Sequence, residues 1–471
     1  MRIRFINTLL GSGLLAAAAL PLTGCSLDIP YDNQFSDPDA ITTPETGREL
    51  LAYAYSSIPN IEFDLALLSD DFQPTYWASR NPTLNNEYTW QRQALIDLSA
   101  SVWPEYYSVI ATVNALTERI PDIKVSSDAD RREVADLTSE CATLKAYCYF
   151  QLLRLYAADP TGPQGMEADG IVIKDRLVME DLPRSSVSQC IAEIRRLLDV
   201  AAESGHQGTD PSWLTADATR LLRAEVELYA GNYAEAAEMA EALLNERGYA
   251  CFGPDVYRNL WDGTQCDERI FVYDNPDVSQ SFYQGIVYDT NTGDYYSVPE
   301  SIATDFTEGD CRTAWSLCPA TTSALGFQYF IGKYNKLRRD KQEIMLINKM
   351  RLSAALYVAA QAWCLDGTNH AKAREAMNRY LSLRGAPLID ESLTGDALLS
   401  EILHQKQLEF LGEGERWFDL KHYRSLLLNE SSARIPAASD YRWQWPIPKD
   451  EYLYNQQMVQ NPEWPTSSYD L

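Results

Sequence analysis

Apolar residues along most of this chain recur every three or four positions, which is the spacing that places them on one face of an α-helix. Two such stripes follow each other between residues 215 and 246, and the sequence Ala-Gly-Asn-Tyr between them predicts a tight helix–helix turn. The first stripe holds Ala218, Leu222, Val226 and Tyr229, and the second holds Tyr233, Ala236, Ala237, Ala240, Leu243 and Leu244. The unit of about 32 residues is close to the tetratricopeptide period.

A second helical hairpin is predicted at about residues 344–384. Its two stripes contain Ile347, Met350, Ala354, Tyr357 and Val358, and then Ala373, Ala376, Met377, Tyr380 and Leu381. Further long helices are predicted at 131–157, 187–203 and 396–412. Neither hairpin has the full Trp-Leu-Gly-Tyr signature of a tetratricopeptide repeat. The predicted fold class is all-α, with stacked tetratricopeptide-like helical hairpins and long, irregular, aromatic-rich loop insertions.

Two stretches break the helical pattern. One begins at Ser69, is irregular to Trp90 and extends to about residue 103. The other covers about residues 252–336 and is rich in Gly, Pro, Asp, Asn and Tyr. Long irregular insertions are usually functional or disordered, and the aromatic content of these two argues against disorder.

The N-terminal segment has the layout of a secretory signal. Arg2 and Arg4 precede an apolar run that ends near Leu20 and is too short and interrupted for a comfortable membrane span. Leu22-Thr23-Gly24-Cys25 then matches a bacterial lipobox, although an ordinary signal followed by a chance cysteine gives the same residues. We expect a signal peptide at 1–24, lipidation of Cys25, a tether over 25–45 and a single domain over 46–471, with its first helix near Thr46.

Composition narrows the function classes. Hydrophobic residues make up 45% and charged residues 23%, which is typical of a globular protein. The net charge of -27 argues against nucleic acid and against anionic lipid head groups, so the lipid has to provide the membrane anchor. Of the eight cysteines besides Cys25, Cys141 and Cys148 lie about 10 Å apart along one helix, too far to form a disulfide.

Signals for catalysis are weak. None of the four histidines is four residues from another, and no GxSxG or P-loop motif occurs. We therefore expect no enzyme activity and no cofactor or metal. The charged and aromatic segment 413–421 is interpreted as structural: Arg416 is expected to pair with Asp419 or Glu413, while Trp417, Phe418 and Leu420 pack the helix onto its neighbours. Asp310 and Arg312 are expected to form a structural pair.

The aromatic insertions are the better candidates for a binding site. Sugars present flat C–H faces and hydroxyl groups, so their sites combine exposed Trp or Tyr rings with Asp, Asn and Arg. The candidates are Asp71, Tyr76, Trp77, Arg80, Asn81, Tyr283, Tyr288, Tyr295 and Tyr296, with Trp90 and Trp315 as further aromatic residues. The alternative is that these rings only pack the loops onto the scaffold.

Four segments resemble the SusD/RagB family of nutrient-binding outer-membrane lipoproteins. These are CATLKAYCYFQLLRLYAADP (141–160), LPRSSVSQCIAEIRRLLDVAAE (182–203), ILHQKQLEFLGEGERWFDLKHYR (402–424) and WQWPIPKDEYLYNQQMVQNPEW (443–464). The chain departs from the family pattern at Gln405-Lys406 (usually Glu-Arg), at Glu463-Trp464 (usually Gly-Tyr) and in the turn Ala-Ala-Asp-Pro, which lacks the usual glycine.

The resemblance implies a non-catalytic protein on the cell surface, held to the outer membrane by its lipid. It implies a protein that captures oligosaccharides or polysaccharides and delivers them to a SusC-like TonB-dependent transporter, with no role for nucleic acid. Three alternatives stay open: peptide binding on the same scaffold, a surface lipoprotein glycosidase, and a helical-hairpin adaptor without a small ligand.

Overall fold

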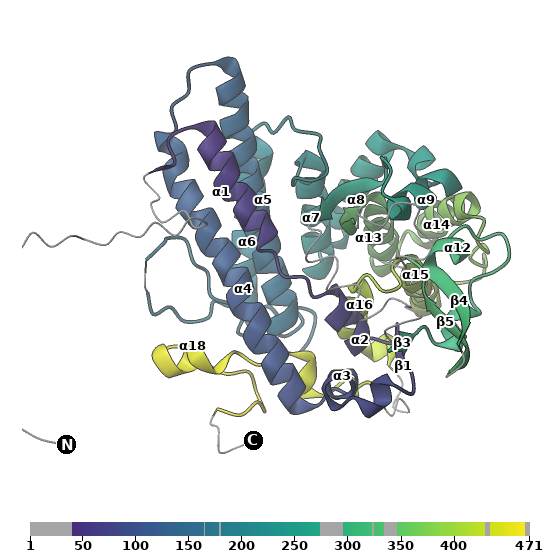
Figure 1. Ribbon diagram of the computed structural model, residues 1–471. Coiled ribbons are helices and arrows are strands. Elements are labelled where there is room, and N and C mark those ends of the chain that lie inside the picture. The colour runs from purple at the N-terminus through teal and green to yellow at the C-terminus, as the bar shows by residue number, and fades with distance from the viewer. Residues whose placement is uncertain are drawn as a thin grey trace, which may run out of the picture. The chain divides into compact units, whose positions relative to one another are not determined.

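The computed structural model describes residues 40–163, 165–178, 180–273, 295–322, 325–333, 346–428 and 434–466 (Figure 1). Helices dominate these residues, and the strands among them are short and paired in twos. This confirms the predicted all-α class.

Four long helices form the N-terminal part of the scaffold: α1 (Pro44–Ser56), α4 (Arg92–Arg119), α5 (Asp128–Tyr156) and α6 (Val187–Glu203). They pack side by side in the order α1, α4, α5 and α6, with α1 also against α5 (Figure 1). Capping boxes begin three of them, at Thr43, Ser127 and Ser186, because each hydroxyl accepts the amide three residues later. Helix α4 begins within the stretch 69–103, so the end of that predicted insertion is part of the scaffold.

The rest of the scaffold is made of antiparallel hairpins. Helices α7 (Ala216–Tyr229) and α8 (Tyr233–Arg247) are joined by a turn in which Gly231 has a φ of 84°. Helices α13 (Leu352–Leu365) and α14 (His370–Arg384) form the next hairpin, and α15 (Gly395–Glu409) and α16 (Glu415–His422) follow. Helix α13 is the central one, since it packs against α7, α8, α14 and α15.

The helical interpretation of residues 347–351 is wrong. Ile347–Arg351 form strand β6, which pairs antiparallel with β2 (Arg269–Tyr273). Nearly all of these residues are buried. Ile347 and Met350 have the three-residue spacing of a helical stripe, but Asn348 and Arg351 are buried as well, so two apolar positions do not distinguish a strand from the start of a helix.

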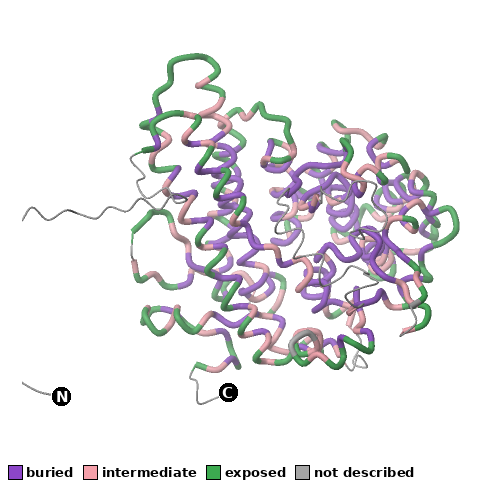
Figure 2. The backbone as a smooth tube through the Cα atoms, viewed as in Figure 1, coloured by how far each residue is buried: buried purple, intermediate pink, exposed green. Residues whose placement is uncertain are grey.

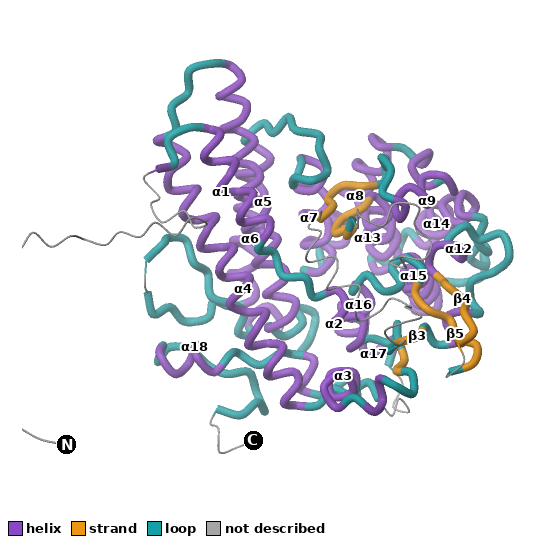
Figure 3. Tube along the Cα trace, viewed as in Figure 1, coloured by secondary structure: helices purple, strands orange, loops and turns teal. Residues whose placement is uncertain are grey.

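The two insertions contain short elements and share a small core. Helix α2 (Glu62–Leu68) leads into the first insertion. The insertions hold β1 (Gln73–Pro74), the 3-10 turn η2 (Ala78–Arg80), α3 (Pro82–Tyr88), α9 (Pro254–Asp262), β3 (Tyr296–Ser297), α11 (Glu300–Ala303), α12 (Thr313–Ser316), β4 (Leu317–Thr322) and β5 (Gly326–Ile331). This second core includes Phe72, Trp261, Tyr296 and Ile331, with Leu408 and Leu411 from the end of α15. Figure 3 shows the strands of the insertions beside α15 and α16, and Figure 2 shows how densely buried that region is.

The C-terminal segment returns to the end of α5. After α17 (Arg424–Leu427), the chain passes Trp443 and Trp445 before α18 (Lys449–Tyr454). Asn461 Nδ2 donates to the carbonyl oxygens of Tyr156 (2.8 Å) and Trp445 (2.6 Å), and its Oδ1 accepts from Arg184 (2.6 Å). The four segments that resemble the family therefore meet here, because Lys421 also donates to Ala157 O (2.9 Å).

A buried network of charges joins the scaffold to the second insertion. Arg351 donates to Glu268 (2.9 Å), Glu413 (2.9 Å) and Glu409, and Arg384 donates to Glu268 (2.7 Å) and Glu409 (3.1 Å). Burial opposes the charge of Glu409, but Arg384, Arg351 and Arg312 outweigh that effect and hold its pKa well below the usual value. Removing one member would leave the charges of its buried partners incompletely balanced.

Two predicted ion pairs have different outcomes. Asp310 and Arg312 form the expected structural pair at 2.8 Å, and both side chains are fully buried. The predicted partners of Arg416 are wrong: its guanidinium pairs with Asp70, at 2.7 and 2.9 Å, while Asp419 pairs with Lys406. Trp417, Phe418 and Leu420 are buried as expected.

We expect Arg351→Met to lower the free energy of unfolding by about 3–5 kcal/mol, because it removes one of the two arginines that donate to the buried Glu409 and Glu268. Arg196→Met is the matched control: its exposed pair with Glu193 on α6 should contribute less than about 1 kcal/mol. Urea denaturation followed by circular dichroism measures both. Equal losses in the two variants would contradict a structural role for the network.

Candidate functional site

Strand pairing brings the two insertions together. In the β1–β3 pair, Gln73 lies opposite Ser297 and Pro74 opposite Tyr296, and the amide of Thr75 donates to Tyr295 O (2.9 Å). One residue further on, the amide of Val298 donates to the carbonyl of Tyr329 in β5 (2.7 Å). Residues 75–81, 295–298 and the β4–β5 hairpin are therefore neighbours in the fold.

Large aromatic side chains are exposed on this part of the molecule. The exposed fraction is 51% for Tyr76, 45% for Trp77 and 55% for Phe327. The Tyr76 and Trp77 rings make an edge contact at 5.3 Å, and the guanidinium of Arg80 lies 4.3 Å from the Tyr76 ring centre. Phe327 packs edge-on against Tyr329 at 4.9 Å. We call Tyr76, Trp77, Arg80, Phe327 and Tyr329 the aromatic surface.

The candidates from the sequence have different surroundings. Tyr76, Trp77 and Arg80 are exposed, Asn81 and Tyr295 are half-buried, and Tyr296 is buried. Tyr283 and Tyr288 lie outside the described residues. Of the further aromatic residues, Trp315 is half-buried in the second core, and Trp90 is buried and donates its indole N–H to Leu68 O (2.9 Å).

Phe327 and Tyr329 were not among the candidate binding residues predicted from the sequence. The signal for them is the alternation of Phe327, Tyr329 and Ile331 in Gly-Phe-Gln-Tyr-Phe-Ile, since every second side chain of a strand lies on the same face. That alternation predicts a strand within the stretch treated as irregular.

Asp71 has a structural environment. It is fully buried, and its carboxylate accepts from the amide of Gly412 (3.0 Å) and from Gln407 Nε2 (3.3 Å). Burial first, and then the neighbouring charge of Asp70, raise the pKa of Asp71 to about 7. These contacts tie the first insertion to the turn between α15 and α16, so we leave Asp71 and the buried Tyr296 out of the aromatic surface.

Other chemistry is sparse within the described ranges. No three His, Cys, Asp or Glu side chains there are grouped so that they could hold a metal ion. The eight described cysteines are free thiols, and seven of them are buried. No helix in these ranges is both long enough and apolar enough to cross a membrane.

The fold is a helical-hairpin scaffold whose paired insertions present exposed aromatic rings. The family model for SusD-like proteins, described as starch-binding and associating with the outer membrane, matches residues 35–204. A SusD-like protein P2 from Formosa agariphila is 24% identical over 422 residues, covering 77% of this chain and 80% of the relative. The chain is therefore similar to SusD-like proteins over most of its length.

Solved structures agree on the fold. A SusD superfamily protein from Bacteroides thetaiotaomicron matches with a TM-score of 0.73 at 21% identity, covering 90% of this chain and 100% of that chain. A SusD-like carbohydrate-binding protein from Bacteroides vulgatus matches with a TM-score of 0.73 at 16% identity, covering 91% of this chain and 99% of that chain.

The pKa of Asp71 predicts a pH-dependent stability. Between the usual aspartate pKa and pH 7, folded Asp71 keeps a proton that the unfolded chain has lost, so stability from this group falls as pH rises. From pH 4.5 to 8, wild-type protein should lose about 3 kcal/mol relative to Asp71→Asn, which lacks this titration. Urea denaturation across that pH range measures the difference. The exposed Asp255→Asn should run parallel to wild type, and a parallel Asp71→Asn curve would contradict the prediction.

Proposed function

We propose that the protein is a cell-surface binding protein that captures oligosaccharides or polysaccharides and delivers them to a SusC-like TonB-dependent transporter. The observation that carries the proposal is the aromatic surface, where Tyr76, Trp77 and Phe327 are each about half exposed. The starch-binding description of the family model and the carbohydrate-binding relative support the same ligand class.

The chemistry of the aromatic surface suits a sugar chain. Exposed indole and phenol rings stack on the C–H faces of pyranose rings, and this stacking requires no change in protonation. The guanidinium of Arg80 is held over the Tyr76 ring, so its N–H groups are positioned to donate to sugar hydroxyls. Binding of this kind is reversible and leaves the glycan intact, as delivery to a transporter requires.

We expect Tyr76→Ala and Trp77→Ala each to weaken polysaccharide binding about tenfold, because each removes one stacking ring. Affinity electrophoresis in gels containing soluble starch or other plant and algal polysaccharides measures the loss. Tyr454→Ala is the matched control, since Tyr454 is 81% exposed on α18 and is not part of the aromatic surface.

Three results would contradict this prediction. Wild-type retardation in the Tyr76→Ala and Trp77→Ala proteins would remove the aromatic surface as the site. Loss of binding only to peptides in these variants would favour the peptide alternative. Release of reducing ends from any of the glycans by wild-type protein would favour a glycosidase.

Lipidation of Cys25 is the proposed means of anchoring at the outer membrane. Because one acyl chain holds a protein only marginally, a lipobox cysteine that carries several would hold it firmly. We expect wild-type protein in cells to incorporate labelled palmitate and to partition into detergent, and Cys25→Ala to do neither. Cys311→Ala, which changes a half-buried thiol of the folded domain, should be labelled like wild type. Labelling of the Cys25→Ala protein would refute the anchor.

A further inference from the structure

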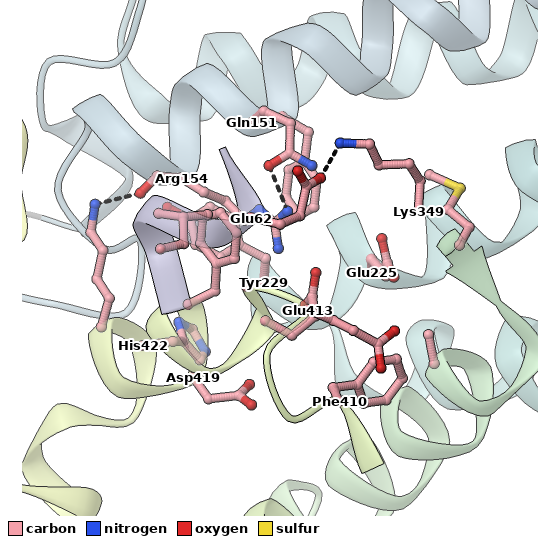
Figure 4. A pocket seen from close by; sticks show the side chains of 18 of the residues that line it. Glu62, Gln151, Arg154, Glu225, Tyr229, Lys349, Phe410, Glu413, Asp419 and His422 are labelled. Carbon is pink, nitrogen blue, oxygen red and sulfur yellow. Dashed lines mark hydrogen bonds and ion pairs between the residues drawn. The ribbon is translucent and has the colours of Figure 1, made fainter. Parts of the chain in front are cut away.

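A cavity lies within the helical scaffold, and none of the residues of the aromatic surface lines it. Its walls come from α2, α4, α5, α7, β6, α13, α15 and α16, and the empty space between them, which opens to solvent, is about 1270 Å³ with the open solvent included. Figure 4 shows the side chains that project into it from different sides, among them Glu62, Arg154, Glu225, Tyr229 and Asp419.

Several polar atoms in the described walls of the cavity form no hydrogen bond. Within the described part of the chain, five buried atoms on lining residues have no hydrogen-bond partner: Glu62 Oε2, Arg154 Nε, Tyr229 OH, Asp419 Oδ2 and Tyr423 OH. Tyr229 and Asp419 are only 8% and 4% exposed. Buried polar atoms of native proteins are nearly always paired, so a group of five around one space indicates that something else fills it.

The charged side chains of the cavity are mostly neutralised by one another. Glu62 pairs with Lys349, Asp419 with Lys406 (2.7 Å) and Asp159 with His422 (2.6 Å). The groups that remain available to a ligand are therefore the separate unpaired donors and acceptors, and the paired side chains around them carry little net charge. An ionic ligand would upset these pairs, whereas hydroxyl groups can both donate to the carboxylate oxygens and accept from Arg154.

Glu225 stands apart from these pairs. It forms no hydrogen bond or ion pair with a described residue, and burial together with the charge of Glu415 raises its pKa to about 7. Glu225 is half-buried, and a carboxyl group without a partner in this position adds no stability to the fold, so packing gives no reason for a glutamate here. A ligand that forms hydrogen bonds with Glu225 would explain why a glutamate is present at this position.

Aromatic rings complete the cavity. Tyr106, Tyr147, Phe150, Phe410 and Phe418 line it, and the Arg154 guanidinium lies 3.6 Å from the Phe418 ring centre. Flat rings next to isolated donors and acceptors match the two kinds of surface that a sugar presents. We propose that this cavity is a second binding site, which takes a neutral mono- or disaccharide. The inference does not depend on whether the aromatic surface binds glycan.

The test uses the purified full chain with Tyr76→Ala and Trp77→Ala, so that the aromatic surface does not contribute. Glucose, galactose, mannose, xylose, maltose and cellobiose are the probes, each titrated by isothermal calorimetry. We expect at least one of them to bind at a single site and to raise the thermal unfolding temperature.

Variants in the cavity decide the location of the site. Glu225→Gln should weaken binding of that sugar at least about fivefold, since it replaces a carboxyl acceptor in the wall. Ala354→Leu, which adds a branched side chain to a half-buried position lining the cavity, should abolish binding. Glu238→Gln is the matched control on the exposed side of α8 and should leave the affinity unchanged.

Two outcomes would overturn the inference. One is that no probe binds, whatever polysaccharides do at the aromatic surface of the parent protein. The other is binding that survives Glu225→Gln unchanged, which would place the sugar elsewhere even if Ala354→Leu fails to fold.

Discussion

The fold depends on a single buried carboxylate and the arginines around it. Glu409, at the end of α15, contacts Arg351 at the end of β6 and Arg384 at the end of α14, and Arg312 of the second insertion lies 3.8 Å away. Each arginine belongs to a different segment, so the charge of Glu409 determines how the hairpins and the insertion meet. Such a group is most stable when it is complete, because each member that is removed leaves charges in a dry interior less well balanced. The network also holds the insertion that contributes to the aromatic surface, because Arg312 and Tyr329 of β5 both belong to the second insertion.

The four segments that resemble the SusD/RagB family are structural in this fold. They meet at the C-terminal end of α5, where Lys421 donates to main-chain oxygens and Asn461 connects Tyr156 to Trp445. These side chains satisfy the carbonyl groups that a helix end leaves unpaired. The exposed rings of the aromatic surface lie outside all four segments. The motifs thus identify a scaffold, and they do not contain the residues of the aromatic surface, although two of them supply walls of the cavity.

Periodicity in the sequence predicted the helical scaffold well because amphipathic helices bury one face and leave the stripe visible. It was wrong at Ile347–Arg351, where a strand is buried on both sides, and it missed α4, whose start follows an irregular loop. The pairing of Asp310 with Arg312 was accessible because the two are two residues apart. The partner of Arg416 could not be predicted, because Asp70 lies 346 residues away in the sequence and comes close only in the folded chain. The burial of Asp71 could not be predicted for the same reason, because its carboxylate accepts from the amide of Gly412, which is 341 residues away in the sequence.

The contrast between Glu409 and Glu225 separates what folding explains from what it does not. Arginines hold the pKa of the buried Glu409 down, whereas loss of water contact and the charge of Glu415 raise the pKa of the half-buried Glu225 to about 7. Glu409 is thus stabilised in its charged form by the fold, and no described residue does the same for Glu225. Tryptophans show the same division: Trp90 is buried with its indole N–H bonded to a carbonyl, while Trp77 leaves almost half of its surface in water. Groups of this kind gather in two places, the cavity and the aromatic surface. The two proposed binding sites would account for both with one chemistry, that of sugars, whose C–H faces cover rings and whose hydroxyls complete hydrogen bonds.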